Sequence, residues 1–526
     1  MPHLLHEWFS ETAVRRSEAT AIVWNDTRMT YGEVERASNR LARALREAGC
    51  RDGERVALLL PKSPDAVVAM LAALKARCLY VPVDIHNPPA RVARIIQACR
   101  PRVILATAAV CPLLAAVRAE CPEARVAKHG CLGGDDPAFD FGQSDVDTLP
   151  CRTLALTGSP EERAHILFTS GSTGQPKGVV IRHSSIARFV EWAVGYFGMG
   201  PGDRVSGHSP LHFDLSTFDI YGAFAAGAEL HMVPPELNLL PHKMAGFIRD
   251  RRLTQWFSVP SAMNFMARTD VVKPGGFPDL RRVLWCGEVL PTPTLIHWMK
   301  HLPHARFTNL YGPTETTIAS SYYTVPECPR DPRAAIPIGM GCGGERLLVL
   351  GSQLRPVPFG ETGDLYIAGV GLAAGYWEDP EKTRAAFVPD ISDGEGDGRM
   401  YRTGDLARVG PDGQVLFVGR ADTQIKSRGY RIELGEIEAA LGTLDGLKDY
   451  AVVAVGTEAF EGATICCAFA AKDGAAMTPT DLRRRLADLV PGYMVPTRWA
   501  TLPDLPKNAN GKIDRRRLHD EVFGPG

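Results

Sequence analysis

A loop rich in glycine, serine and threonine, residues 168–178 (FTSGSTGQPKG), is the first segment whose side chains could do chemistry. It follows a predicted strand at residues 165–168. Such a loop can turn backbone N–H groups and hydroxyls toward the oxygens of a phosphate. The GxxxxGK[ST] spacing of a Walker loop is absent, and a flexible linker would have the same composition. The loop is therefore a candidate phosphate site that needs support from other segments.

Residues 309–317 (NLYGPTETT) place an aromatic ring, a tight Gly-Pro turn and a carboxylate close together. Tyr311 could stack on a nucleotide base. Glu315 could hold a magnesium ion that bridges phosphates, because hard cations prefer carboxylate oxygen. A strand that ends in a turn with a solvated glutamate would look the same.

Two shorter segments could complete such a site. Residues 401–405 (YRTGD) end in Asp405, a carboxylate that could accept hydrogen bonds from both hydroxyls of a ribose. Residues 510–514 (NGKID) contain Lys512, which could place a positive charge on a reacting carboxylate and phosphate. Taken alone, each of the two also fits an ordinary surface turn.

The elements that must position these segments alternate between helix and strand. Thr30 and Glu33 have the spacing of a capping box and open a predicted helix. Residues 55–60 and 79–83 are predicted strands, and residues 64–76 between them a predicted helix. This β-α-β unit indicates a parallel sheet covered by helices. The pattern recurs to about residue 415, so the expected fold class is α/β.

A change of pattern follows residue 419. The remaining part, of about 100 residues, reads as α+β, which suits a small mobile lid domain. The expected domains are residues 1–419, a large core, and residues 420–526, the lid. The helices and strands predicted within the lid are residues 433–441 (helix), 450–455 and 464–471 (strands) and 480–490 (helix).

Composition excludes several classes of function. The 526 residues suggest two or three domains, and a formal net charge of -1 offers no basic field for nucleic acid or an anionic membrane. The first residues do not have the pattern of a signal peptide, and no apolar run is long enough for us to expect a membrane span. The 12 cysteines form no CxxC pair, which argues against a zinc framework. We expect a cytoplasmic enzyme that binds neither nucleic acid nor membrane.

Together, and in this order, the segments resemble the acyl-adenylate-forming superfamily, and most closely the adenylation domains of nonribosomal peptide synthetases. The resemblance covers nearly the whole chain, and chance agreement across so many ordered segments is negligible. The segments that carry it are residues 74–84, 168–178, 213–214, 309–317, 360–365, 401–405, 419–433 and 510–514.

The resemblance implies ATP and Mg²⁺ as cofactors, an ATP site, a catalytic group and a hinge. It implies Glu315 as the metal ligand and Asp422 as the hinge about which the lid rotates. The ATP site would consist of Thr169, Ser170, Gly171, Thr173, Lys177, Asn309, Tyr311, Gly312, Asp405 and Arg420. The catalytic group would be Lys512, Glu315 and Thr314.

The resemblance also implies a pocket for an amino acid. In amino-acid-activating members an aspartate at the position of Asp214 pairs with the substrate ammonium; as an alternative, Asp214 caps a helix. The pocket positions are apolar and crowded by two phenylalanines, so a compact apolar amino acid is expected, with L-proline as first choice and valine, leucine and alanine open. The pocket would be lined by Asp214, Leu215, Phe218, Phe257, Leu284, Cys286, Leu310, Ile318 and Ala319.

The implied partner is a separate, phosphopantetheinylated peptidyl carrier protein, because no carrier-protein serine motif follows residue 514. The enzyme is therefore expected to be free-standing. Arg428, Arg431 or residues 483–485 could contact an acidic carrier, although solvated surface charge explains them equally well. Residues 426–429 are expected near the pantetheine channel by analogy. The rival hypotheses are a D-alanyl-carrier-protein ligase, a CoA ligase for an apolar acid, and a binding module without catalysis.

Overall fold

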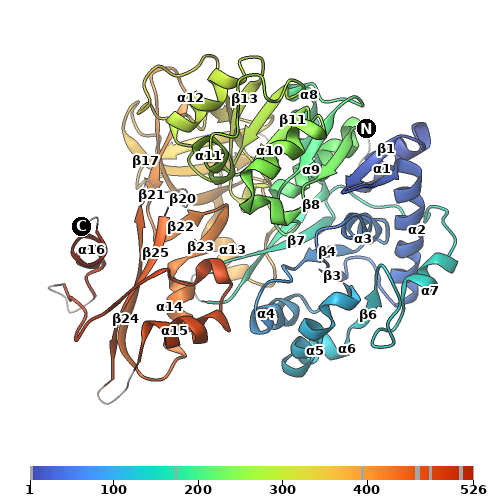
Figure 1. Ribbon diagram of the computed structural model, residues 1–526, viewed down its shortest axis with the longest axis horizontal. Helices are drawn as coiled ribbons and strands as arrows, with labels where there is room; N and C mark the ends of the chain where they lie inside the picture. Colours follow the sequence, from blue (N-terminus) through green and yellow to red (C-terminus); the bar gives the residue numbers. More distant parts are fainter. Residues whose placement is uncertain are drawn as a thin grey trace.

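The computed structural model describes residues 4–171, 174–391, 396–456, 463–472, 477–508 and 513–524. Two large sheets with helices between and outside them form the greater part of the molecule, and the C-terminal residues form a smaller unit beside them (Figure 1). No helix in these residues is long and apolar enough to cross a membrane.

The first sheet has seven strands in the order β18-β8-β7-β4-β3-β5-β6. Its central strands are parallel, as the β-α-β pattern predicts, while β8 and β18 pair antiparallel. Helices α4 (Pro89–Cys99), α5 (Cys111–Glu120) and α6 (Pro122–Val126) cover one face through a shared apolar cluster. The strands are β3 (Arg55–Leu59), β4 (Leu79–Pro82), β5 (Val103–Ala106), β6 (Lys128–Cys131), β7 (Arg163–Thr169), β8 (Lys177–Arg182) and β18 (Gly375–Tyr376).

The second sheet has nine strands in the order β15-β14-β13-β12-β11-β9-β10-β1-β2. Its outer face is covered by α10 (Pro241–Asp250), α11 (Pro260–Arg268) and α12 (Thr292–His301). The strands are β1 (Thr20–Trp24), β2 (Thr27–Thr30), β9 (Arg204–Gly207), β10 (Glu229–Met232), β11 (Gln255–Ser258), β12 (Arg282–Trp285), β13 (Arg306–Tyr311), β14 (Ser321–Thr324) and β15 (Met340–Gly341).

The main core lies between these two sheets and is filled by helices that contact both. The predicted capping box is confirmed at the start of α2, where the Thr30 hydroxyl accepts from the Glu33 N–H and the Glu33 carboxylate accepts from the Thr30 N–H (2.8 Å). The helices of this layer are α1 (Leu5–Arg15), α2 (Tyr31–Glu47), α3 (Pro64–Lys75), α8 (His183–Phe197) and α9 (Leu215–Ala226); α7 (Gln143–Thr148) packs against α2.

The prediction that the β-α-β pattern continues to about residue 415 is wrong. Parallel pairing ends at β13, because β14 pairs antiparallel with both β13 and β15. Of the later strands, β18 joins the first sheet and the others form a third, antiparallel sheet, in which the β16–β17 and β20–β21 connections are too short for the crossover that parallel pairing needs. Its members are β16 (Glu345–Leu350), β17 (Thr362–Gly369), β19 (Phe387–Pro389), β20 (Arg399–Val409) and β21 (Val415–Arg420), with α13 (Pro380–Ala386) beside them.

The C-terminal residues have apolar clusters of their own. A two-stranded hairpin leads into a three-stranded sheet flanked by two helices, close to the positions predicted from the sequence. The elements are β22 (Gln424–Ser427), β23 (Tyr430–Glu433), α14 (Leu434–Gly442), β24 (Leu447–Gly456), β25 (Ala463–Ala471), α15 (Pro479–Ala487), β26 (Arg498–Thr501) and α16 (Arg515–Arg517).

Candidate active site

A cavity of about 110 Å³ lies where the large sheets meet the β22–β23 hairpin. Loops after β7 and β13 and the start of α9 form one side of it, and the hairpin forms the other. The residues predicted from the sequence that line it are Thr169, Ser170, Asp214, Leu215, Cys286, Gly312, Thr314, Asp405 and Arg420. Segments more than 200 residues apart in the sequence therefore share one space.

The predicted phosphate loop begins at the end of β7. The Ser170 hydroxyl donates to the backbone carbonyl of Arg431 in the hairpin (2.7 Å). The Thr169 hydroxyl is buried and has no partner among the described residues, which leaves a donor available to a ligand. A side chain at Gly171 would collide with the Gln175 carbonyl oxygen at 2.1 Å, so the loop needs glycine there. Thr173 lies outside the described residues.

Glu315 is completely buried in the turn after β13. Its carboxylate accepts hydrogen bonds from the Tyr376 hydroxyl (2.8 Å) and from Nη1 of Arg431 (2.9 and 2.7 Å). The Lys177 ammonium, at the start of β8, lies 3.4 Å away. Burial alone would raise the pKa of this carboxyl, but the charges of Arg431 and Lys177 more than offset burial and hold the pKa well below its usual range.

Asp405, on β20, sits between two groups of the predicted ATP site. It accepts a hydrogen bond from the Tyr311 hydroxyl and one from Nη1 of Arg420 (2.6 Å). Nε of Arg420 also donates to Asp422, the predicted hinge residue, in the turn between β21 and β22 (2.9 Å). Asn309 does not line the cavity, because its amide donates to the Pro337 carbonyl (2.8 Å).

Asp214 precedes α9 but makes no side-chain cap to the helix, so the alternative of a structural N-cap is wrong. Its carboxylate instead accepts from the Thr314 hydroxyl (2.7 Å) inside the cavity. Burial raises the pKa of Asp214 to about 6, against the opposing effects of Thr314 and Lys426. This carboxyl would bind a cationic group readily, because a positive partner would offset its burial.

The predicted amino-acid wall forms one buried cluster behind Asp214. Of its apolar members, Leu215 and Cys286 line the cavity directly, and the others lie one layer deeper; the Phe218 and Phe257 rings meet edge to face at 5.8 Å. The cavity wall also contains Val259, which the sequence reasoning missed. The deeper members are Phe218, Phe257, Leu284, Leu310, Ile318 and Ala319.

The hairpin supplies several cavity residues that were not predicted for the ATP site or the amino-acid pocket. Arg431, expected to be surface charge or a carrier contact, is instead turned inward onto Glu315, with its side chain 17% exposed. Gly429 donates its N–H to Glu288 (2.8 Å), and a Cβ at Gly429 would lie 2.6 Å from a methyl of Val259. The alternation of side chains along β23 could have predicted the direction of Arg431. Ile432 faces the core of the C-terminal unit, so its neighbour Arg431 must face away from that core.

The described part of the C-terminal unit holds no predicted catalytic residue, because Lys512 lies outside the described residues. Its neighbour Ile513 packs against the apolar cluster of β24 and β25, and Asp514 caps α16. The role of Lys512 stays a prediction.

Comparison with known proteins agrees with this arrangement. The profile of the family described as AMP-binding enzyme matches residues 9–377, and that of the AMP-binding enzyme C-terminal domain matches residues 436–512. The chain is 34% identical over 523 residues to an L-proline--[L-prolyl-carrier protein] ligase of Pseudomonas fluorescens, covering 99% of this chain and 100% of that protein.

Two further relatives support the same assignment. Tyrocidine synthase 3 of Brevibacillus parabrevis is 36% identical over 517 residues, or 98% of this chain, which spans 8% of that synthetase. The crystal structure of the Vibrio cholerae adenylation domain AlmE with glycyl-adenosine-5'-phosphate superposes with a TM-score of 0.84 at 25% identity, over 100% of this chain and 98% of that one. The chain therefore belongs to the AMP-binding enzyme family and is of the nonribosomal-peptide-synthetase adenylation type.

Proposed function

We propose that this protein is an AMP-forming ligase that activates a small apolar amino acid with ATP and transfers it to the thiol of a phosphopantetheinylated carrier protein. The observation that carries the proposal is the position of Asp214. Its carboxylate lies in the same cavity as Thr169, Ser170 and Asp405, with an apolar wall behind it. An ammonium and a carboxylate of one amino acid can therefore face Asp214 and the nucleotide loops together.

Asp214 would recognise the substrate through its amino group. Leaving a buried carboxylate without a cationic partner is unfavourable, so an acid that lacks the ammonium should bind poorly. This requirement separates the proposed amino-acid ligase from a CoA ligase for an apolar acid.

L-Proline is the first choice of substrate. The wall consists of Leu215, Val259 and Cys286. Burial raises the pKa of the Cys286 thiol to about 12, so the thiol is neutral. These three side chains favour a compact apolar substrate. The full-length similarity to a ligase for L-proline supports the same choice. D-Alanine, alanine, valine and leucine are the alternatives, because a single methyl group changes binding by only about 1–3 kcal/mol.

The nucleotide would lie along Thr169, Ser170, Tyr311 and Asp405. Magnesium fits Glu315 chemically, since its carboxylate is ionised and hard cations prefer carboxylate oxygen. In this structure Arg431 donates hydrogen bonds to that carboxylate. Magnesium would therefore bind Glu315 only when the lid has moved and Arg431 no longer contacts it. Bound there, magnesium would supply positive charge to the phosphate oxygens of ATP.

The first reaction joins the amino-acid carboxylate oxygen to the α-phosphorus of ATP, and the bond to pyrophosphate breaks. Backbone N–H groups and hydroxyls of the 168–178 loop, with Lys177 and Lys512, would stabilise the charge that accumulates on the phosphate oxygens. In the second reaction the thiol sulfur attacks the acyl carbon, and the bond to AMP breaks. Holding the reacting groups together can contribute about 7–11 kcal/mol.

A route for the thiol adjoins the site. A second cavity, of about 690 Å³, shares His212, Tyr430 and Tyr493 with the first and lies between the large sheets and residues 491–493 of the C-terminal unit. Such a passage suits a long, narrow arm such as phosphopantetheine. We propose the domain division at residue 419, with rotation about Asp422 exchanging the hairpin for the segment that contains Lys512.

Amino-acid-dependent exchange of pyrophosphate into ATP tests the proposal, with the twenty amino acids, D-alanine and deaminated acids as substrates. L-Proline should give the strongest exchange, and Asp214→Ala and Lys512→Ala should lose most of it. A weak response to proline would reject the substrate but not the reaction. Absence of AMP or pyrophosphate with every acid would reject the reaction itself, and faster acyl transfer to CoA than to holo-carrier protein would favour the CoA ligase.

A further inference from the structure

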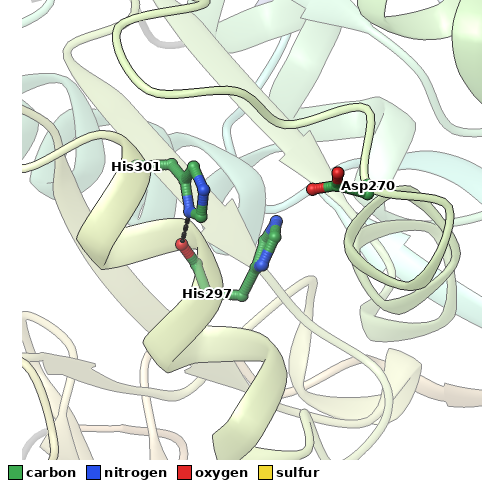
Figure 2. Close-up of side chains that lie close together, drawn as sticks. All are labelled: Asp270, His297 and His301. Atoms are coloured by element: carbon green, nitrogen blue, oxygen red, sulfur yellow. Dashed lines mark hydrogen bonds between the residues drawn. The ribbon is translucent and has the colours of Figure 1, made fainter.

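Two histidines and an aspartate gather on the outer face of the nine-stranded sheet, in a place that the proposed reaction does not use. His297 and His301 lie one turn apart on α12, and Asp270 lies just after the end of α11 (Figure 2). Each offers one ligand atom, and these atoms lie within 4.8 Å of one another. This is the only such group of three in the described part of the chain.

The two imidazole rings lie side by side, with centroids 4.2 Å apart and an interplanar angle of 30°. Nδ1 of His301 donates to the carbonyl oxygen of His297 (2.7 Å), because a carbonyl can only accept. The proton is thus fixed on Nδ1, which leaves the lone pair of Nε2 for a metal. Nε2 of His297 is buried and has no hydrogen-bond partner among the described residues. An unpaired ring nitrogen beside a second histidine can serve as a metal ligand.

Asp270 completes the set with an oxygen donor. Its backbone adopts φ +52°, which turns the chain at the end of α11 toward α12. Figure 2 shows its carboxylate on the side of the cluster that the His297 ring faces. Ligand atoms around a tetrahedral zinc lie about 3.4 Å apart, given bonds of about 2.0–2.1 Å. Side-chain rotations that move the ligand atoms by roughly 1 Å would therefore bring all three atoms within bonding distance of one ion.

Lys273 is the competing group, since its ammonium pairs with Asp270. Both side chains are more than 60% exposed, at 61% and 63%, and an ion pair this exposed stabilises the structure little. Lys273 can swing into solvent when a more strongly bound cation arrives.

We propose that Asp270, His297 and His301 form a binding site for a divalent transition-metal ion of the zinc class, with water as the remaining ligand. Two imidazole nitrogens and one carboxylate suit zinc, nickel or copper, whereas magnesium and calcium prefer oxygen alone. The ion joins the end of α11 to the last turn of α12. These helices follow β11 and β12, which carry Phe257 and Leu284 of the amino-acid wall.

The test uses untagged, full-length protein, freed of metal with EDTA and titrated with Zn²⁺ by calorimetry. Wild-type protein should bind zinc and gain thermal stability. His297→Ala, His301→Ala and Asp270→Asn should each weaken binding by at least about tenfold. Lys273→Ala should tighten it by up to about fivefold, because it removes the competing cation. His242→Ala, which changes an exposed histidine on α10, is the matched control and should bind as wild type.

Cobalt substitution gives a second readout, since visible absorption bands of tetrahedral Co²⁺ should be present in wild type and absent in the ligand variants. The Asp270 side chain is exposed, so the Asp270→Asn variant should fold even if a histidine variant does not. Unchanged zinc affinity in Asp270→Asn, or weaker binding in Lys273→Ala, would overturn the site. None of these measurements depends on pyrophosphate exchange, so the proposed function stands or falls separately.

Discussion

Replacing Arg431 by alanine should separate the two reactions proposed for this enzyme. Arg431 belongs to the hairpin, yet its guanidinium neutralises Glu315, a completely buried carboxylate of the large domain. The contact exists only while the hairpin faces the cavity. Removing the guanidinium therefore destabilises the lid position in which Arg431 contacts Glu315. It does not change the stability of a lid position in which this contact is absent.

The size of the effect follows from the remaining partners. Removal of one member of a buried ion pair costs about 3–5 kcal/mol when the other member is left uncompensated. Lys177 still lies 3.4 Å from Glu315, and the Tyr376 hydroxyl still donates to it, so the lower end of that range applies. About 3 kcal/mol corresponds to a shift of roughly 100-fold in the lid equilibrium.

The assay measures both half-reactions on one protein. Transfer of a preformed aminoacyl adenylate to holo-carrier protein, in a single turnover, should slow by up to about 100-fold in Arg431→Ala. Pyrophosphate exchange should stay within about threefold of wild type, since the proposed first reaction uses the other lid position. Arg484→Ala, which removes a lid arginine that is 78% exposed, is the control and should change neither rate. Equal loss of both half-reactions, or of neither, would refute the reasoning.

Three further predictions follow from individual residues. In a pH–rate profile, kcat/KM for the amino acid should rise through about pH 6 and then level off. The reason is that the pKa of Asp214 is raised to about 6 and only the ionised carboxylate pairs with an ammonium. The Asp214→Asn variant should bind the amino acid weakly and show no such rise. Gly429→Ala should slow carrier transfer but spare exchange, because its Cβ would lie 2.6 Å from Val259; Gly413→Ala, with a similar φ of +78° and nothing within 4 Å, is the control in the same two assays. Phe218→Ala should lower the free energy of unfolding by about 3–5 kcal/mol in a denaturant titration, because the ring is fully buried behind the pocket wall.

Short sequence patterns predicted individual helices and strands correctly where neighbouring residues determine them. The Thr30–Glu33 capping box starts α2 as expected, and the strands of residues 55–60 and 79–83 lie in a parallel sheet. The predicted β-α-β pattern ends at β13, because an antiparallel strand and a buried parallel strand can have similar local sequences. The difference lies in which neighbour each strand pairs with, and that is decided over long sequence separations.

The candidate site divides in the same way. The motifs identified Thr169, Asp214, Thr314 and Asp405 as site residues, and all four line one cavity. Arg431 could not be placed by such reasoning. Strand alternation fixes the face on which it lies, but its partner depends on how the hairpin docks, and that docking depends on contacts between distant segments.

Those contacts join residues that are far apart in the sequence. Tyr430 stacks on Tyr493 at 3.7 Å and meets Phe213 edge to face at 5.0 Å, while Gly429 fits against Val259. Each contact joins segments between about 60 and 220 residues apart, and none has a periodic signal of its own. Because the docking aims Arg431 at Glu315, substitution of Arg431 directly tests how the lid works.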